Sequence, residues 1–138
     1  MQKLLALLKG GAIMPIIQIK SLPFRKTIDQ TKILKEIGNR VSQASGIPIN
    51  RLVIYWEDIK PNSYIFDGEF SEFTKEDSHH PIVYISCLEG KPEEQEESII
   101  STVAKVLSEE LSINKENVAV IFNRIHSRRL FVKGDFII

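Results

Sequence analysis

The sequence predicts an α+β (α/β) fold in which two tandem βαβ units form one four-stranded sheet with two helices on one face. The chain of 138 residues is long enough for one domain or two very small ones. Its second half repeats the apolar pattern of its first half, with Pro81 in the place of Pro15. Each copy reads as strand, helix, strand and hairpin. A strand–helix–strand unit of this length closes as a right-handed parallel crossover.

The repeat aligns residues 15–70 with residues 81–136 without a gap and leaves residues 71–80 as a polar linker. Pro15-Ile16-x-x-Ile19 returns as Pro81-Ile82-x-x-Ile85. Only ten of the fifty-six aligned pairs are identical, so the evidence lies in apolar positions that keep their register. The alternative is that two βα units look alike by chance. On the repeat interpretation, residues 14–138 form a single domain.

Each copy is expected to contain two strands and a terminal hairpin. The first strands are short and rich in β-branched residues, and the second strands are continuous apolar runs, as in strands buried on both faces. Short segments around residues 64–66 and 130–132 lead to Gly68 and Gly134, which predicts a hairpin at the end of each copy. The expected strands are Ile16–Lys20, Leu52–Trp56, Ile82–Leu88 and Val118–Phe122.

A helix is expected between the two strands of each copy. The first opens with the capping-box pattern Thr27-x-x-Gln30 and stops at Gly46 and Pro48. The second begins after Pro92, and its run of glutamates is typical of a solvated first turn that complements the helix dipole. The expected core stripes are Ile33, Ile37, Val41 and Ala44 in the first helix, and Ile99, Ile100, Val103, Leu107 and Leu111 in the second.

With both helices on one face, the other face of the sheet is bare and apolar. Burying such a face requires a partner, and closed cyclic assemblies provide one. The pattern therefore predicts a homo-oligomer.

Composition excludes several classes of protein. Eighteen basic residues balance eighteen acidic ones, so there is no broad basic surface for nucleic acid or for a membrane. The single cysteine, Cys87, excludes a disulfide framework and a cysteine-rich zinc site. No glycine-rich phosphate loop or metal motif is present, so neither a cofactor nor a metal is expected. The apolar stretch Leu4–Leu8 is too short for a signal peptide or a membrane span, which favours a cytoplasmic protein.

The order of these motifs resembles the tautomerase superfamily. In both copies a Pro-Ile-x-x-Ile strand is followed by a basic residue ten positions after the proline, an amphipathic helix, an apolar strand and a hairpin ending in glycine. The second copy, with Pro81-Ile82-x-x-Ile85-x-x-Leu88-Glu89-Gly90-Lys91, is similar to 4-oxalocrotonate tautomerase. Two tandem units in one chain resemble macrophage migration inhibitory factor. The resemblance covers residues 14–136 and implies a cofactor-free enzyme that assembles as a homotrimer.

In that family the catalytic base is an amino-terminal proline. A free prolyl nitrogen is a secondary amine that carries or loses a proton, whereas a proline inside a chain is a tertiary amide without basicity. Burial near cations lowers the pKa of such an amine toward neutrality, where a general base works best. Pro81 is therefore not a base, and Pro15 becomes one only as the first residue. Met14 directly precedes Pro15, so translation from Met14 and removal of that methionine would expose it.

Residues 1–13 then have two interpretations. Lys9-Gly10-Gly11 can be encoded by a purine tract of the ribosome-binding kind, at a workable distance before the Met14 codon. On that hypothesis residues 1–13 are translated leader sequence. The alternative is a genuine amino-terminal extension, such as a short helix that covers the pocket.

The resemblance implies further site residues. Arg25 stands where the family binds a substrate carboxylate, and a guanidinium suits a carboxylate through two parallel hydrogen bonds. Tyr64 stands where a hairpin aromatic lines the pocket. Lys91, the counterpart of Arg25, and Arg124 are weaker candidates for substrate binding. The family's second catalytic arginine is missing, because its positions are occupied by Val53 and Ala119. Each candidate has a structural alternative: an exposed loop arginine, hairpin packing, or a solvated strand end.

The remaining reactive side chains have structural interpretations. His79 and His80 are adjacent, and neighbouring strand residues point to opposite faces, so they make a poor metal pair. His126 is isolated in the sequence, and Cys87 falls in an expected strand without a base beside it.

Two functions follow. The first is a tautomerase-like isomerase, or a related proton-transfer or hydration enzyme, acting on small enolic or unsaturated carboxylates, with Pro15, Arg25 and Tyr64 as catalytic residues. The alternative is a catalytically inactive homotrimer of the same fold that binds a small molecule or a protein, which the missing arginine favours. A third reading is an antiparallel βαββαβ ligand-binding module, although the hairpins do not fit it.

Overall fold

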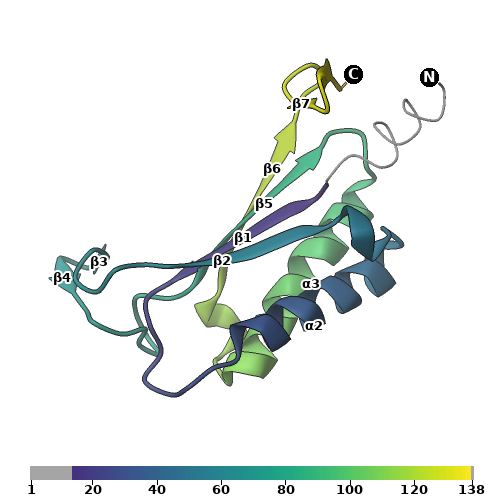
Figure 1. Ribbon diagram of the computed structural model, residues 1–138. Coiled ribbons are helices and arrows are strands. Elements are labelled where there is room, and N and C mark those ends of the chain that lie inside the picture. Colours follow the sequence, from purple (N-terminus) through teal and green to yellow (C-terminus); the bar gives the residue numbers. More distant parts are fainter. Residues whose placement is uncertain (1–13, 138) are drawn as a thin grey trace.

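In the computed structural model, which describes residues 14–137, a four-stranded sheet carries two helices on one face (Figure 1). The first unit consists of β1 (Ile16–Ser21), α2 (Gln30–Ser45), β2 (Val53–Asp58) and the hairpin of β3 (Ile65–Phe66) and β4 (Glu69–Phe70). The second consists of β5 (Ile82–Leu88), α3 (Glu93–Leu111), β6 (Ala119–Ile125) and the hairpin of β7 (Phe131–Val132) and β8 (Asp135–Phe136). Short 3₁₀ turns, Ile49–Arg51 and Lys115–Asn117, precede β2 and β6.

The strand order is β2-β1-β5-β6. Within each unit the two strands are parallel, with Ile17 opposite Ile54 and Ile85 opposite Phe122. The two first strands meet antiparallel at the centre of the sheet, where Ile17 lies opposite Ile85. The predicted tandem βαβ fold is therefore confirmed, and the all-antiparallel module is excluded. The antiparallel centre also places the start of β1 beside the end of β5.

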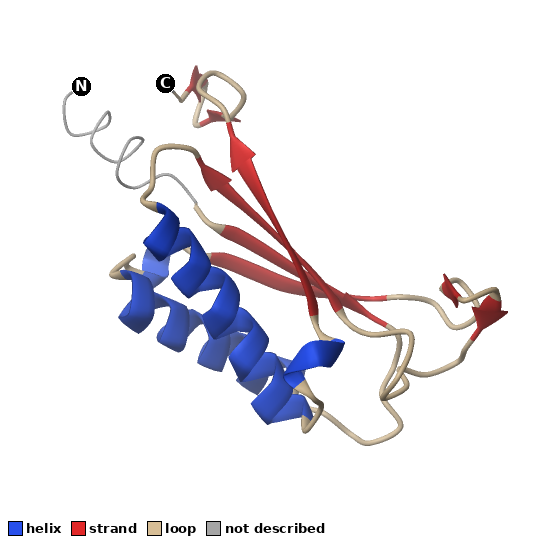
Figure 2. Ribbon diagram, turned by 180° about the vertical axis from the view of Figure 1, so that it is seen from behind, coloured by secondary structure: helices blue, strands red, loops and turns tan. Residues whose placement is uncertain are grey.

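The core lies between the sheet and the helices, which cover the same face of the sheet (Figure 2). Alternate residues of β1 and β5 point into it, because side chains alternate along a strand. The fully buried apolar residues of these strands are Ile17, Ile19, Val83, Ile85 and Cys87. The helices contribute Ile33, Ile37, Val41, Ile99, Val103, Val106, Leu107 and Leu111.

The helix stripes depart from the prediction in both helices. Ala44 is exposed rather than buried, and Gly38 is buried instead, where its missing side chain leaves room for Ile49 and Ile54. Ile100 is half-buried at the edge of the core. A helix has 3.6 residues per turn, so its buried face also includes residues beside the predicted stripe, such as Gly38 and Val106.

The start of α2 also differs from the prediction. Its cap is Asp29, whose carboxylate accepts a hydrogen bond from the Lys32 N–H at 3.1 Å, so the predicted Thr27 capping box is wrong. Asp and Thr are both good caps, and the helix begins at the later one. The predicted end is confirmed: Gly46 closes the helix at a φ of 78°, which glycine adopts without strain.

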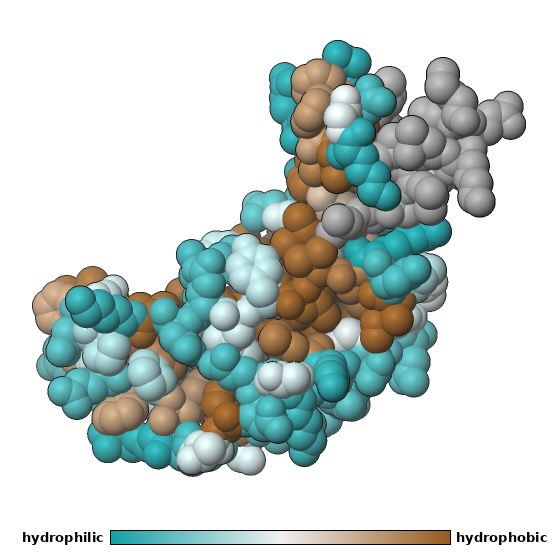
Figure 3. Space-filling model, viewed as in Figure 1, coloured by the Kyte–Doolittle hydropathy of each residue, from teal (hydrophilic) through white to brown (hydrophobic). Residues whose placement is uncertain are grey.

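The second strands begin one residue later than predicted and continue further. Within one chain only one of their faces is covered: Tyr55 and Ile121 are 38% and 43% exposed. They belong to the uncovered side of the sheet, here called the open face. Its apolar and aromatic members are Ile16, Val53, Tyr55, Ile82, Tyr84, Leu88, Ala119, Ile121 and Ile125. Apolar side chains also gather between the β7–β8 hairpin and the helices (Figure 3).

The two predicted hairpins are present and project from opposite ends of the sheet (Figures 1 and 2). Each turns through a residue pair with positive φ, Asp67-Gly68 and Lys133-Gly134, as a two-residue hairpin turn requires. Five of their apolar side chains are at least 45% exposed: Ile65, Phe66, Phe70, Phe131 and Phe136. A two-stranded hairpin has little stability in water by itself, so these arms lack a packing surface in one chain.

In the described part of the chain, neither helix combines the length and hydrophobicity needed to cross a membrane.

Candidate functional site

The antiparallel pairing of β1 and β5 divides the candidate residues between two ends of the sheet. Ile16 lies opposite Ser86, so the same register, continued by one step, puts Pro15 opposite Cys87. Lys20 lies opposite Ile82 at the other limit of the pairing. We call these the Pro15 end and the Pro81 end.

Pro15 itself is buried at the start of β1. Its carbonyl accepts a hydrogen bond from the Val53 N–H at 3.2 Å, and the N–H of Met14 donates to the Arg51 carbonyl at 2.9 Å. In the 138-residue chain the Pro15 nitrogen belongs to a peptide bond with Met14, so it has no proton to exchange. The predicted leader or extension, residues 1–13, lies outside the described residues.

Two of the predicted cationic side chains lie at the Pro15 end. Lys91 follows β5 and is half-buried, and its ammonium partly offsets the effect of burial, which raises the pKa of the Cys87 thiol. Arg124 lies opposite Cys87 on β6 and points to the helix side of the sheet, where it meets Glu96. The Pro15 end therefore combines a strand-opening proline with a lysine and an arginine.

Arg124 is held by a buried carboxylate. Its Nε donates to both oxygens of Glu96, at 3.1 and 2.9 Å, and its Nη2 donates to Oε1 at 2.6 Å. Glu96 is 4% exposed, whereas the Arg124 side chain is 51% exposed. The hydrogen bond from Arg124 holds the pKa of Glu96 below its usual range, against the opposing effect of burial. Arg124 is thus an ion-paired residue rather than a solvated strand end.

The other two candidates, Arg25 and Tyr64, lie at the Pro81 end. The Arg25 guanidinium stacks over the ring of Phe73, 4.8 Å from its centre. The Tyr64 hydroxyl donates to the His80 carbonyl at 3.3 Å, and burial raises the pKa of this tyrosine. Since the six residues of β1 span about 20 Å, one chain does not bring Arg25 or Tyr64 to Pro15.

The histidines near Tyr64 serve different purposes. His79 is buried and uses both ring nitrogens, with Ser78 Oγ and the Glu69 carbonyl each at 2.9 Å. His80 has a buried Nε2 for which the described residues provide no hydrogen-bond partner. Among the described residues, no three His, Cys, Asp or Glu side chains come together as a metal site.

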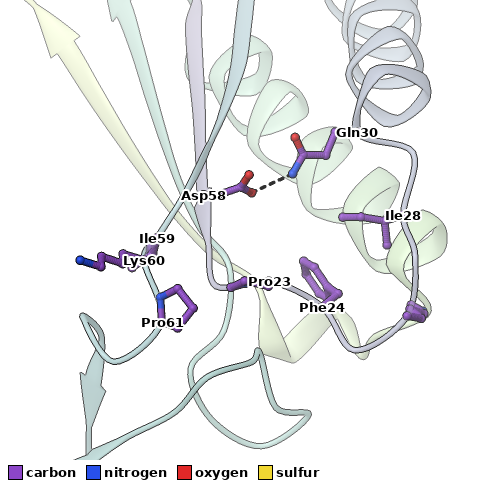
Figure 4. Close-up of a pocket in the computed structure, with 9 residues that line it drawn as sticks. Pro23, Phe24, Ile28, Gln30, Asp58, Ile59, Lys60 and Pro61 are labelled. Carbon is purple, nitrogen blue, oxygen red and sulfur yellow. Dashed lines mark hydrogen bonds between the residues drawn. The ribbon is translucent and has the colours of Figure 1, made fainter.

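A small pocket opens near the Pro81 end, beside the loop that carries Arg25 (Figure 4). Pro23, Phe24 and Ile28 line one side, and Ile59 and Pro61 line the other. At its edge the Gln30 amide donates to Asp58 at 2.8 Å. Its walls are mostly apolar, and none of the predicted site residues lines it.

Sequence analysis missed the role of Glu96. The glutamate run was interpreted as a solvated first turn, yet Glu96 stands three, four and seven residues before Ile99, Ile100 and Val103. That spacing places it on the buried stripe of α3, and this signal was available in the sequence. The pairing of Glu96 with Arg124 on β6 could not be predicted in this way, because the matching positions of the first unit hold Gln30 and Asp58.

The Glu96–Arg124 pair gives a testable acid sensitivity. Because the pKa of Glu96 is lowered in the folded protein, its contribution to stability is present above the usual range of a glutamate and lost as pH falls through the lowered pKa. Arg124→Leu removes the cause of the shift, so the free energy of unfolding is expected to decrease less steeply between about pH 7 and about pH 3. Urea unfolding across this pH range tests the prediction, with Arg129→Leu as the exposed control. Equal pH slopes of the free energy of unfolding in the parent and in Arg124→Leu would contradict the prediction.

Comparisons with known proteins agree with this fold. The family model described as Tautomerase enzyme matches residues 81–137. Pt0534 inactivated by 2-oxo-3-pentynoate has a TM-score of 0.74 and 18% identity, over 87% of this chain and 93% of that chain. A fused 4-OT wild-type symmetric trimer has a TM-score of 0.73 and 17% identity, over 88% and 95%. A member of the cis-3-chloroacrylic acid dehalogenase family has a TM-score of 0.70 and 13% identity, over 90% and 84%. No curated protein matches the sequence.

The resemblance found in the sequence is therefore confirmed. The second unit matches the tautomerase family model, and the fold of the whole chain is similar to the folds of Pt0534 and the fused 4-OT trimer.

Proposed function

We propose that the protein is a cofactor-free tautomerase-like isomerase, or a related proton-transfer enzyme, that acts on small enolic or unsaturated carboxylates. The proposal rests on one observation: the second unit matches the tautomerase family, and the first unit opens with the same Pro-Ile-x-x-Ile strand directly after a methionine. Translation from Met14 and removal of that methionine make Pro15 the first residue of the active form.

Pro15 is the base in this proposal. Its secondary amine removes a proton from the hydroxyl or carbon of an enol acid and returns it to a different carbon, so the reaction moves one proton and changes no oxidation state. The apolar surroundings of Pro15 and the nearby cations favour the neutral amine, which is the form that accepts a proton.

The substrate carboxylate needs a cation beside Pro15. Lys91 fills this role from the same chain, since it follows the strand that runs antiparallel to β1. Arg25 and Tyr64, at the far end of β1, take part only where an oligomer places them beside the Pro15 of a second copy. Arg124 is the other predicted cation of the Pro15 end, although Glu96 occupies one edge of its guanidinium.

Separate substitutions distinguish these cations. Lys91→Ala is expected to weaken enol-acid binding by about 1.5–3 kcal/mol, the value for a charged hydrogen bond, with little change in thermal stability. Substrate KM and melting temperature are the measurements, with Lys105→Ala on the outside of α3 as the control. Arg25→Ala belongs in the same series: an equal rise in KM indicates that a second copy completes the site. An unchanged KM in Lys91→Ala would contradict the role of Lys91.

A homotrimer is the proposed assembly. The open face and the two hairpins leave apolar side chains without a packing surface in one chain, and a cyclic oligomer covers both. The fused 4-OT relative, of similar length and fold, is a symmetric trimer.

The alternative is a trimer of the same fold without catalytic activity that binds a small carboxylate or a protein. Val53 and Ala119 favour it, because they occupy the positions where the family resemblance implies a second arginine. Amino-terminal sequencing of the protein made in its native host separates the two functions. The enzyme requires Pro15 as the first residue, and a mature chain that retains residues 1–13 would contradict the proline mechanism.

A further inference from the structure

The loop that carries Lys91 is fastened to β6 on both sides. This loop, residues 89–92, joins β5 to α3 and turns at Gly90, whose φ of 103° is strained for any other residue. Before the turn, the N–H of Glu89 donates to the Ile125 carbonyl at 3.0 Å. The Glu89 carboxylate accepts a hydrogen bond from the Ser127 N–H at 3.0 Å and lies 2.6 Å from His126 Nδ1.

The second attachment follows the loop. Glu96, in the first turn of α3, accepts three hydrogen bonds from Arg124 of β6. It is the one carboxylate of the described residues that is buried. A buried carboxylate is costly unless it is paired, so this position is tolerated only together with Arg124. In the sequence, Lys91 therefore lies between two carboxylates, one bound to β6 and one bound to the residues directly after it.

Lys91 is electrostatically close to this arrangement and to Pro15. Lys91 lies three residues after the end of β5, and the antiparallel register sets this end of β5 beside the start of β1. In agreement with this position, its ammonium favours the charged forms of both Glu96 and Cys87. Cys87 is the residue that the strand register sets opposite Pro15. A loop fixed at residues 89 and 96 thus keeps the ammonium at the Pro15 end.

The other end of the sheet provides an internal comparison. At the matching positions of the first unit, Pro23 replaces Glu89 and Lys60 replaces His126, so the first attachment has no counterpart. Gln30 and Asp58 replace Glu96 and Arg124, with one hydrogen bond of 2.8 Å in place of three. A requirement of the fold alone would act on both units equally. Among the described residues, the carboxylate attachments of Glu89 and Glu96 occur at the end where the proline can become a free amine, and the Pro81 end has only the single Gln30–Asp58 hydrogen bond at the matching positions.

We propose that Glu89 and Glu96 are positioning residues that hold the Lys91 loop on β6, so that its ammonium binds the substrate carboxylate beside Pro15. The inference rests on the proposed function for its substrate class, but it concerns binding and loop order and needs no catalytic turnover. Neither carboxylate touches the substrate; each acts through Lys91.

The test uses fumarate, a stable unsaturated dicarboxylate, as the probe, in the 138-residue chain and in the form that begins at Pro15. Glu89→Gln and Glu96→Gln keep the side-chain size and remove the charge. His126→Ala removes the contact between Glu89 and the exposed His126 ring. This variant keeps the test decisive if a glutamate variant does not fold. Glu109→Gln, which breaks a 2.7 Å ion pair to Arg40 elsewhere on α3, is the matched control.

Amide exchange of Gly90 and Lys91 is expected to rise at least about fivefold in the first three variants, and fumarate affinity is expected to fall about fivefold, as for the loss of one oriented ion pair. Glu109→Gln is expected to change neither. In a Lys91→Ala background, Glu89→Gln should cause no further loss of affinity, because the two residues act as one unit.

Additive losses in that double variant would overturn the inference, as would unchanged exchange or the absence of fumarate binding by both parent forms. Failure of the proposed function is a separate result. It would appear as absent ketonisation by the Pro15 form while the loop and binding measurements behave as described.

Discussion

Protein that begins at Pro15 is expected to ketonise phenylenolpyruvate at least about a hundredfold faster than the 138-residue chain, the range in which a positioned general base contributes. The difference has one cause. In the long chain the Pro15 nitrogen is a tertiary amide bonded to Met14, whereas in the short form it is a secondary amine beside Lys91. Stopped assays or continuous absorbance on both purified forms give the ratio.

Pro15→Ala in the short form is the matched variant. It keeps a free amino terminus but replaces the secondary ring amine with a primary amine of different basicity and geometry, so most of the rate should be lost. Circular dichroism and oligomer mass control for folding. Equal rates in the long and short forms would refute the proline mechanism, and equal inactivity with this substrate would favour the non-enzymatic trimer.

Ile121→Glu is expected to convert the proposed trimer into monomers. Ile121 lies on the open face of the edge strand β6 and is 43% exposed in the single chain. If that face is the interface, the substitution buries three unpaired carboxylates per trimer. The free-energy cost of burying each charge is far larger than the free energy gained by burying one apolar side chain there. Sedimentation or light scattering at micromolar concentration measures the mass.

The control for this prediction is Lys105→Glu, a charge change on the exposed outside of α3. It is expected to leave the mass at three chains. A monomeric parent protein would contradict the trimer proposal. A trimeric Ile121→Glu protein would contradict the proposal that the open face is the interface.

Most of the fold could be predicted from the sequence because its apolar periodicity is strong. The two alternating strands at the sheet centre and the stripe from Ile99 to Leu111 agree with their predicted bounds to within one or two residues. Boundaries failed where two local signals compete. Thr27 and Asp29 are both good caps, and the side chain of Asp29 is the one that caps the helix. The second strands were extended because their polar ends pair with β1 and β5, which is information from another part of the chain.

The candidate site was harder to predict, for a reason that lies in the topology. The repeat correctly places a basic residue ten positions after each proline, but it does not show which proline each basic residue approaches. That depends on how β1 and β5 pair, and their antiparallel register exchanges the partners: Lys91 comes to the Pro15 end and Arg25 to the Pro81 end. The Glu89–His126 contact joins residues 37 apart and follows from no local pattern.

Reaction with 2-oxo-3-pentynoate is the sharpest test of whether Pro15 is the reactive base. This compound inactivates Pt0534, which shares the fold. An amine that adds to its triple bond becomes covalently labelled, and the bond formed can be located by peptide mass spectrometry. The account predicts one adduct per chain, on the Pro15 nitrogen of the form that begins at Pro15, and no label at this residue in the 138-residue chain. Labelling confined to Lys91 or Cys87, or a short form that resists the reagent, would contradict the claim that Pro15 is the reactive base.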